Sequence, residues 1–139
     1  MFSLNVPLPP AVARLATDLH PKLSGFDRVR ERRTLVCKRF GVEDVRSEGD
    51  DRAEPPDRTD ALDRLRERLR RPLSGTDPFE VAVTGIDVFD APRSGSRPVV
   101  YLAVESDGLI RVHRRLCDTF GAVEGIEDDG YVPHITLAR

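Results

Sequence analysis

Residue types that could act on a phosphate group recur near both ends of the chain. His134 and Thr136 stand two residues apart near the carboxyl end, and Arg32 and Thr34 stand two residues apart near the amino end. Alternate side chains of a β-strand point to the same face, so a strand would present each pair together. An imidazole can transfer a proton, and hydroxyl and guanidinium groups can donate hydrogen bonds to phosphate oxygens.

The two pairs occupy the same place in an internal repeat. Residues 2–7 and 99–104 have strand patterns, each is followed by a helix pattern, and each unit then reaches its polar pair. In both units the pair continues as Thr-Leu, with similar spacing from the first strand. Two strand–helix–strand units packed about a pseudo-twofold axis would aim both pairs into one cleft. A phosphate there would meet two hydroxyl donors and two basic groups.

The pattern of apolar residues predicts five strands and three helices, hence an α+β fold. A change of phase at Gly85 predicts a β-bulge in the third strand. The expected helices start near Pro10, Thr59 and Ser106 and end near Pro21, Pro72 and Gly121. The expected strands cover residues 2–8, 32–40, 79–89, 98–105 and 131–139.

Residues 42–58 separate the two units and differ from them in composition. Acidic residues, arginines and Pro55-Pro56 dominate this stretch, which is typical of a solvated, mobile loop. A loop of this length is unusual in a compact domain, which raises the prospect of a lid over the site. A tolerated surface insertion is the commoner explanation.

Composition narrows the class of protein. The chain has 139 residues, of which 39% are apolar and 33% charged, enough for one domain spanning residues 1–139. The net charge of −2 does not indicate nucleic-acid binding, and the strong preference for arginine over lysine fits a GC-rich genome as easily as phosphate contacts. No apolar run could span a membrane, and no secretory signal is visible. We therefore expect a cytoplasmic monomer without a membrane partner.

Metal and thiol chemistry are not expected. Cys37 and Cys117 are too few for a structural zinc site or a disulfide scaffold, and we interpret both as small apolar residues. We expect His20 to have a structural role at a helix end and His113 to be exposed on a helix. Neither has a second ligand at metal spacing, so no metal site is predicted.

The run Tyr-Val-Pro-His-Ile-Thr-Leu-Ala-Arg at residues 131–139 resembles the second signature of the 2H phosphoesterases. This group includes the 2′-5′ RNA ligase-like proteins and the RNA cyclic phosphodiesterases, and the order of elements agrees over nearly the whole chain. The resemblance implies a bilobal fold whose two pseudo-symmetric units, with antiparallel sheets, flank a central cleft. It also implies one histidine as general base, another as general acid, and threonine hydroxyls on the phosphate. RNA ends or cyclic nucleotides would be the partners, with no metal and no nucleotide cofactor.

Carried onto this sequence, the resemblance gives catalytic roles to His134, Thr136 and Thr34. Arg32 stands where the first motif would have its histidine, although an offset of one residue would select Arg33. A guanidinium cannot act as a general base, but it can stabilise negative charge on a phosphate. Strand alternation places Lys38 on the face of Thr34, as a ligand of a distal phosphate or a surface lysine. The expected phosphate ligands are Arg32, Arg33, Lys38 and Arg139.

The chain also ends at Arg139, whereas the family normally continues with a further strand and helix. A truncated gene product is one interpretation of this difference, and Arg139 would then either reach the phosphate or fray at the terminus.

Three functions stay open on this sequence. The first is a phosphoesterase acting on RNA 2′,3′-cyclic phosphates or 2′-5′ linkages, weakened by the missing first histidine. The second is a non-catalytic module that binds RNA ends or nucleotide phosphates. The third is an α+β scaffold whose repeat carries no site.

Overall fold

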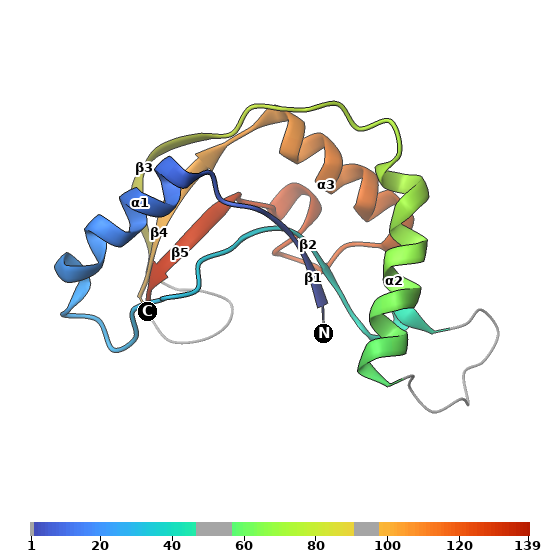
Figure 1. Cartoon of the computed structure of the whole chain (residues 1–139), viewed down its shortest axis with the longest axis horizontal. Helices are drawn as coiled ribbons and strands as arrows, with labels where there is room; N and C mark the ends of the chain where they lie inside the picture. The colour runs from blue at the N-terminus through green and yellow to red at the C-terminus, as the bar shows by residue number, and fades with distance from the viewer. Residues whose placement is uncertain (1, 47–56, 91–97) are drawn as a thin grey trace.

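A computed structural model describes residues 2–46, 57–90 and 98–139, which form the predicted α+β fold (Figure 1). Short 3-10 helices cover His20–Leu23 (η1), Val42–Val45 (η2) and Asp128–Gly130 (η3). The helices are α1 (Pro10–Leu19), α2 (Arg58–Leu73) and α3 (Asp107–Phe120). The strands are β1 (Phe2–Val6), β2 (Leu35–Phe40), β3 (Ala82–Phe89), β4 (Val99–Glu105) and β5 (His134–Ala138).

The five strands form one antiparallel sheet in the order β1-β2-β5-β4-β3. The predicted repeat units are β1–α1–β2 and β4–α3–β5, and they meet where β2 lies beside β5. Exchanging the two units maps this part of the sheet onto itself, as a pseudo-twofold axis requires. The units therefore share a continuous sheet, and β3 extends it at one edge.

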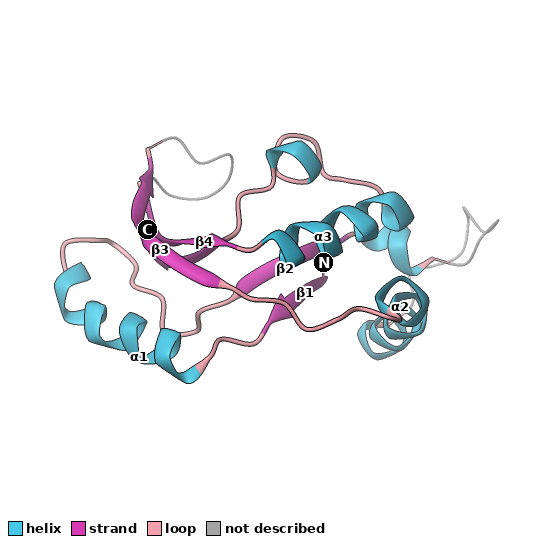
Figure 2. Cartoon of the chain, turned by 90° about the horizontal axis from the view of Figure 1, so that it is seen from above, coloured by secondary structure: helices cyan, strands magenta, loops and turns pink. Residues whose placement is uncertain are grey.

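One face of the sheet carries the apolar core and is covered by helices. Figure 2 shows α3 lying along β2, and its stripe of Leu109, Val112 and Leu116 is buried there. Leu35 and Ile135, from the two central strands, are each only 1% exposed in the same core cluster. At the start of α3 the Ser106 hydroxyl accepts a hydrogen bond from the Leu109 N–H, as an N-cap does. We call the opposite side of the sheet the open face.

Helix α2 differs in detail from its predicted limits. Its N-cap is Asp57, whose carboxylate accepts from the Asp60 N–H, so the helix starts before the expected caps Thr59 and Asp60. Pro72 lies inside the last turn, and the helix ends one residue later. Its outer arginines are largely solvated and pair weakly with neighbouring acids, as Arg66 does with Asp63.

Part of the predicted loop 42–58 forms regular structure in the described segments. Its first residues form η2, in which the Asp44 carboxylate accepts from the Gly41 N–H at 2.7 Å and Val45 is buried. Residues 47–56 lie outside the described part of the chain, and the lid and insertion interpretations fall on them. Within the described segments, no helix combines the length and apolar character needed to cross a bilayer.

The pairing of the strands shifts at three β-bulges, in β3, β2 and β5. The bulge predicted near Gly85 is confirmed by a register shift in β3 between Val83 and Gly85. In β2, Leu4 pairs with Lys38 but Asn5 pairs with Val36, so Cys37 is an extra residue. Cys37 and Lys38 therefore both face the helices, and Arg39 turns to the open face.

The bulge in β5 has the same effect as that in β2. Tyr101 pairs with Thr136 but Val100 pairs with Ala138, so Leu137 is the extra residue. Leu137 and Ala138 are both buried, and alternation then carries Arg139 to the open face.

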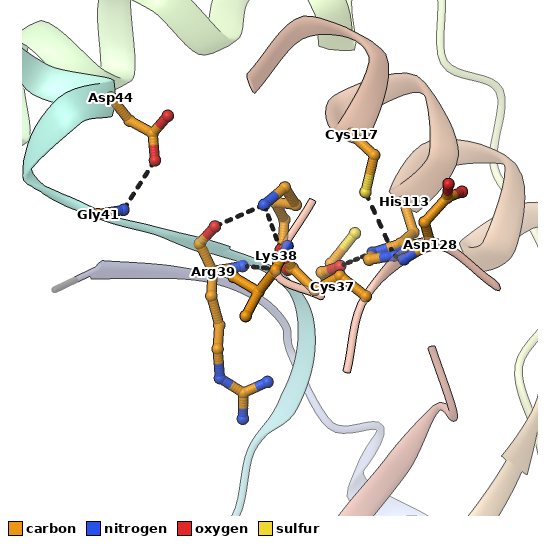
Figure 3. Close-up of polar contacts among 10 residues, drawn as sticks. Cys37, Lys38, Arg39, Gly41, Asp44, His113, Cys117 and Asp128 are labelled. Atoms are coloured by element: carbon orange, nitrogen blue, oxygen red, sulfur yellow. Dashed lines mark hydrogen bonds and ion pairs between the residues drawn. The ribbon is translucent and has the colours of Figure 1, made fainter. Parts of the chain in front are cut away.

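Polar side chains satisfy the backbone of β2 where it leaves β5. The β2–β5 pairing consists of Leu35 with Ile135, and beyond it the strands diverge. The Tyr131 hydroxyl donates to the Val36 carbonyl at 2.7 Å. Figure 3 shows a second such bond, in which His113 Nδ1 donates to the Cys37 carbonyl at 2.6 Å. The expectation of an exposed His113 is wrong, because its ring is fully buried and stacks on Tyr131.

The centre of this region is a buried ion pair. Lys38 Nζ lies 2.6 Å from Glu127 Oε1, and both side chains are only 2% exposed. Glu127 also accepts from the N–H groups of Arg39 and Val123, while Lys38 donates to the Arg39 carbonyl. Burial tends to raise the pKa of Glu127, but these hydrogen bonds outweigh it and lower that pKa. The carboxylate is therefore held ionised.

We predict that Glu127→Leu lowers the free energy of unfolding by about 3–5 kcal/mol, because it leaves the Lys38 ammonium buried and unpaired. Urea denaturation followed by circular dichroism measures this loss. The matched control is Glu67→Leu on α2, which removes an exposed carboxylate and has little effect. Adding Lys38→Met to Glu127→Leu restores part of the stability, since no unpaired charge remains. Equal losses for Glu127→Leu and Glu67→Leu would contradict the assignment.

Candidate functional site

The two polar motifs meet at the centre of the sheet. Because Leu35 pairs with Ile135 in antiparallel register, Thr34 lies opposite Thr136, and Val36 lies opposite His134. The core residues Leu35 and Ile135 point toward the helices, so both threonines and His134 point to the open face, where all three are half-buried. The pseudo-twofold axis passes between the two threonines.

His134 is held in the tautomer that a general base needs. Its Nδ1 lies 2.6 Å from the Val132 carbonyl, which can only accept, so Nδ1 carries the proton and Nε2 keeps its lone pair. Burial lowers the pKa of His134, and the positive charges of Arg39 and Arg139 lower it further, against the opposing hydrogen bond to Val132. The imidazole is therefore neutral near neutral pH and able to accept a proton.

Two aromatic rings fix the position of this imidazole. The rings of Phe89 and Tyr101 stack with centroids 4.1 Å apart, and each meets the His134 ring edge-on at about 5.5 Å. Tyr101 is paired with Thr136 across β4 and β5, so it extends the open face toward β3. The apolar run that predicts β4 gives no sign of which side chains face the site, and for that reason these rings were not predicted.

Two arginines lie near His134, one of them expected from the sequence and the other not. Arg139, which was expected, and Arg39, which was not, both lie close enough to influence the His134 imidazole. Regular alternation from Thr34 selects Lys38 and misses Arg39, because the bulge at Cys37 is not visible in the sequence. The expectation that Lys38 shares the face of Thr34 is wrong, since Lys38 is buried against Glu127 on the helix side.

No described contact links the first-motif arginines to His134. Arg32 is exposed and precedes β2, and nothing in the described part of the chain joins it to His134. Arg33 is half-buried, with its guanidinium 3.5 Å from His20 Nδ1 at the end of α1. Its Nε is buried without a hydrogen-bond partner among the described residues. The structure thus brings together Thr34, Thr136, His134 and Arg139, and it directs Arg33 toward α1.

Among the described residues, neither the cysteines nor a metal-binding cluster adds thiol or metal chemistry to this site. Burial raises the pKa of Cys37 to about 11 and raises that of Cys117, so both thiols stay protonated. Among the described residues no cluster of histidine, cysteine and carboxylate side chains could hold a metal ion. A pocket of about 480 Å³ at the end of β2 is lined by Arg39 and Phe120 among others, but by neither His134 nor the threonines.

We predict that His134 titrates below the ordinary histidine pKa of 6.5 and that Arg39→Gln raises its pKa, because a nearby positive charge is removed. Proton NMR of the imidazole measures both values. Arg66→Gln, an equal change of charge on α2, leaves the pKa of His134 unchanged. A lowered pKa also means that the unfolded state binds more protons, so His134 contributes stability above pH 6.5 that is lost as the pH falls. Titration of His134 at or above 6.5 would contradict the neutral base.

Comparison with known proteins bears mainly on the second repeat unit. A family model described as the 2′-5′ RNA ligase superfamily matches residues 52–139, more than half of the chain. The match covers the second repeat unit with His134 and Thr136, whereas Thr34 and Arg39 precede it. No curated protein matches the chain.

Proposed function

The chain belongs to the 2′-5′ RNA ligase superfamily, and on that premise we propose that it is a phosphoesterase acting on RNA 2′,3′-cyclic phosphates or 2′-5′ linkages. The observation that carries this proposal is the register of β2 and β5. It supports a phosphate held between the hydroxyls of Thr34 and Thr136, with the proton-accepting edge of His134 on the same face.

In the proposed hydrolysis, water attacks the phosphorus of the cyclic phosphate and one bond from phosphorus to a ribose oxygen breaks. His134 Nε2 takes the proton of the attacking water. The threonine hydroxyls donate hydrogen bonds to the non-bridging oxygens, and Arg139 stabilises the charge that develops on them. The leaving ribose oxygen takes its proton from solvent, because Arg32 cannot act as the second acid–base group. A missing general acid typically costs a factor of about 10²–10⁴ in rate.

A second candidate function is a module that binds RNA ends without turnover. The observation that favours it is the arginine at position 32, which leaves the site with one titrating group where the family resemblance implies two. Such a module would use the same threonines and arginines, and its affinity would fall as the salt concentration rises. Turnover separates the two functions.

We predict that the protein opens a 2′,3′-cyclic phosphate at the end of an oligoribonucleotide and that His134→Ala slows this reaction by about 10²–10⁴-fold, because the general base is removed. Separation of the linear and cyclic products by chromatography measures the rate. His20→Ala removes a histidine at the far end of α1 and serves as the matched control. Binding of the oligoribonucleotide without turnover by the unmodified protein would favour the non-catalytic module. If the protein neither binds nor turns over this RNA, the α+β scaffold without a site is favoured.

We also predict that Thr34→Val and Thr136→Val each lower kcat/KM by about 10²-fold, the usual loss when one donor to a developing oxyanion is removed. Valine keeps the branched shape that suits a strand, so folding is preserved. The double variant loses less than the product of the single losses, because both hydroxyls bind one phosphate. Serine at either position retains the hydroxyl and most of the rate. Full activity of Thr34→Val would contradict the assignment of a phosphate ligand to the first repeat unit.

A further inference from the structure

The bulges in β2 and β5 each deliver an arginine to the open face, on either side of the candidate site. Arg39 follows the bulge in β2, and Arg139 follows the bulge in β5. His134 lies between them in the sheet, near enough to both guanidinium groups for their charges to lower its pKa. Each repeat unit thus uses the same backbone device to place a positive charge beside the reacting centre.

The segment before the first motif adds two more arginines. Arg28 forms a hydrogen-bonded antiparallel pair with Arg139, with N–O distances of 3.1 and 2.8 Å in the two directions. The Arg30 N–H donates to the Leu137 carbonyl at 2.8 Å, and Val29 bridges to Ala138. Residues opposite each other in an antiparallel pair point to the same face, so Arg28 accompanies Arg139. We call Arg28, Arg30, Arg39 and Arg139 the arginine cluster.

The members of the cluster influence one another. Burial lowers the pKa of Arg139, and the charges of Arg30, Arg28 and Arg39 lower it further. Like charges gathered this closely repel each other, and the repulsion falls when an anion lies among them. The gathering is local, because the whole chain has a net charge of −2.

One reacting phosphate does not account for four arginines. A cyclic phosphodiester carries a single negative charge, and the two threonines and Arg139 already surround the place proposed for it. Arg39 and Arg28 lie on opposite sides of that place, on β2 and beside the end of β5. An RNA strand carries one negative charge per nucleotide, so its neighbouring phosphates would extend past the reacting one toward such positions.

We propose that the arginine cluster, apart from Arg139, binds the phosphates next to the reacting one, so that the substrate is the end of an RNA strand in preference to a nucleoside cyclic monophosphate. This inference rests on the proposed function, since it assigns the same site a longer substrate. Arg39 and Arg28 would donate charge-assisted hydrogen bonds to backbone phosphates without reading the bases. These three arginines therefore act on affinity and on KM, while His134 and Arg139 act on the chemical step.

The test compares two substrates, a nucleoside 2′,3′-cyclic monophosphate and a short oligoribonucleotide that ends in the same cyclic phosphate. We expect a higher kcat/KM for the oligoribonucleotide. We expect Arg28→Gln and Arg39→Gln to reduce this preference by about 10-fold each through KM, because each removes a charged ligand of a backbone phosphate. The dependence of log K on log salt for the oligoribonucleotide becomes shallower by about 0.7 for each phosphate that is no longer bound. Arg66→Gln and Arg70→Gln on the exposed side of α2 are the matched controls.

Each other outcome overturns a distinct statement. Equal kcat/KM for both substrates, with no effect of Arg28→Gln or Arg39→Gln, overturns the role of the cluster and leaves the proposed function intact. A preference that falls equally in the α2 controls shows general attraction by charge and also overturns it. Neither turnover nor binding of either substrate overturns the proposed function, and the inference falls with it.

Discussion

The ion pair between Lys38 and Glu127 is the interaction on which the centre of the sheet depends. It lies where β2 separates from β5, at a place where backbone N–H and C=O groups would otherwise be buried without partners. Glu127 takes up two N–H groups and Lys38 one carbonyl, while His113 and Tyr131 take up two more carbonyls. Removing water from two charges is costly, and the surrounding hydrogen bonds offset that cost. The strands can thus diverge without leaving unsatisfied groups in the core.

This divergence decides what reaches the open face. The bulge at Cys37 turns the ammonium of Lys38 inward to Glu127 and turns the guanidinium of Arg39 outward to His134. Lys38, whose charge stabilises the fold, and Arg39, whose charge influences His134, are therefore adjacent in sequence but lie on opposite faces of the sheet. The threonines need no such device, since each is the chain neighbour of a residue in the Leu35–Ile135 pair that joins β2 to β5.

The sequence predicts much of this arrangement, because its signals are local and periodic. Strand alternation and helix spacing locate the elements, and the repeated Thr-Leu motif predicts that Thr34 and Thr136 share a site. The faces of Lys38 and Arg39 could not be predicted, because a β-bulge arises from pairing between distant strands. His113 was missed for a related reason: its burial depends on Tyr131 and on a carbonyl of β2, which no pattern within α3 reveals. The environment of Glu127 likewise depends on β2, far away in the chain.

The bulge in β2 also makes the chemistry of the site depend on how a strand pairs as much as on its residue types. If the same residues paired without the bulge, regular alternation would exchange the faces of Lys38 and Arg39. Deleting the codon for Cys37 would instead remove the extra residue together with the bulge and leave both side chains on their present faces. Related chains with identical residues around this strand can therefore differ in the charge that they present to a phosphate. Their alignments are informative at this point only when gaps are placed with the backbone pairing in view.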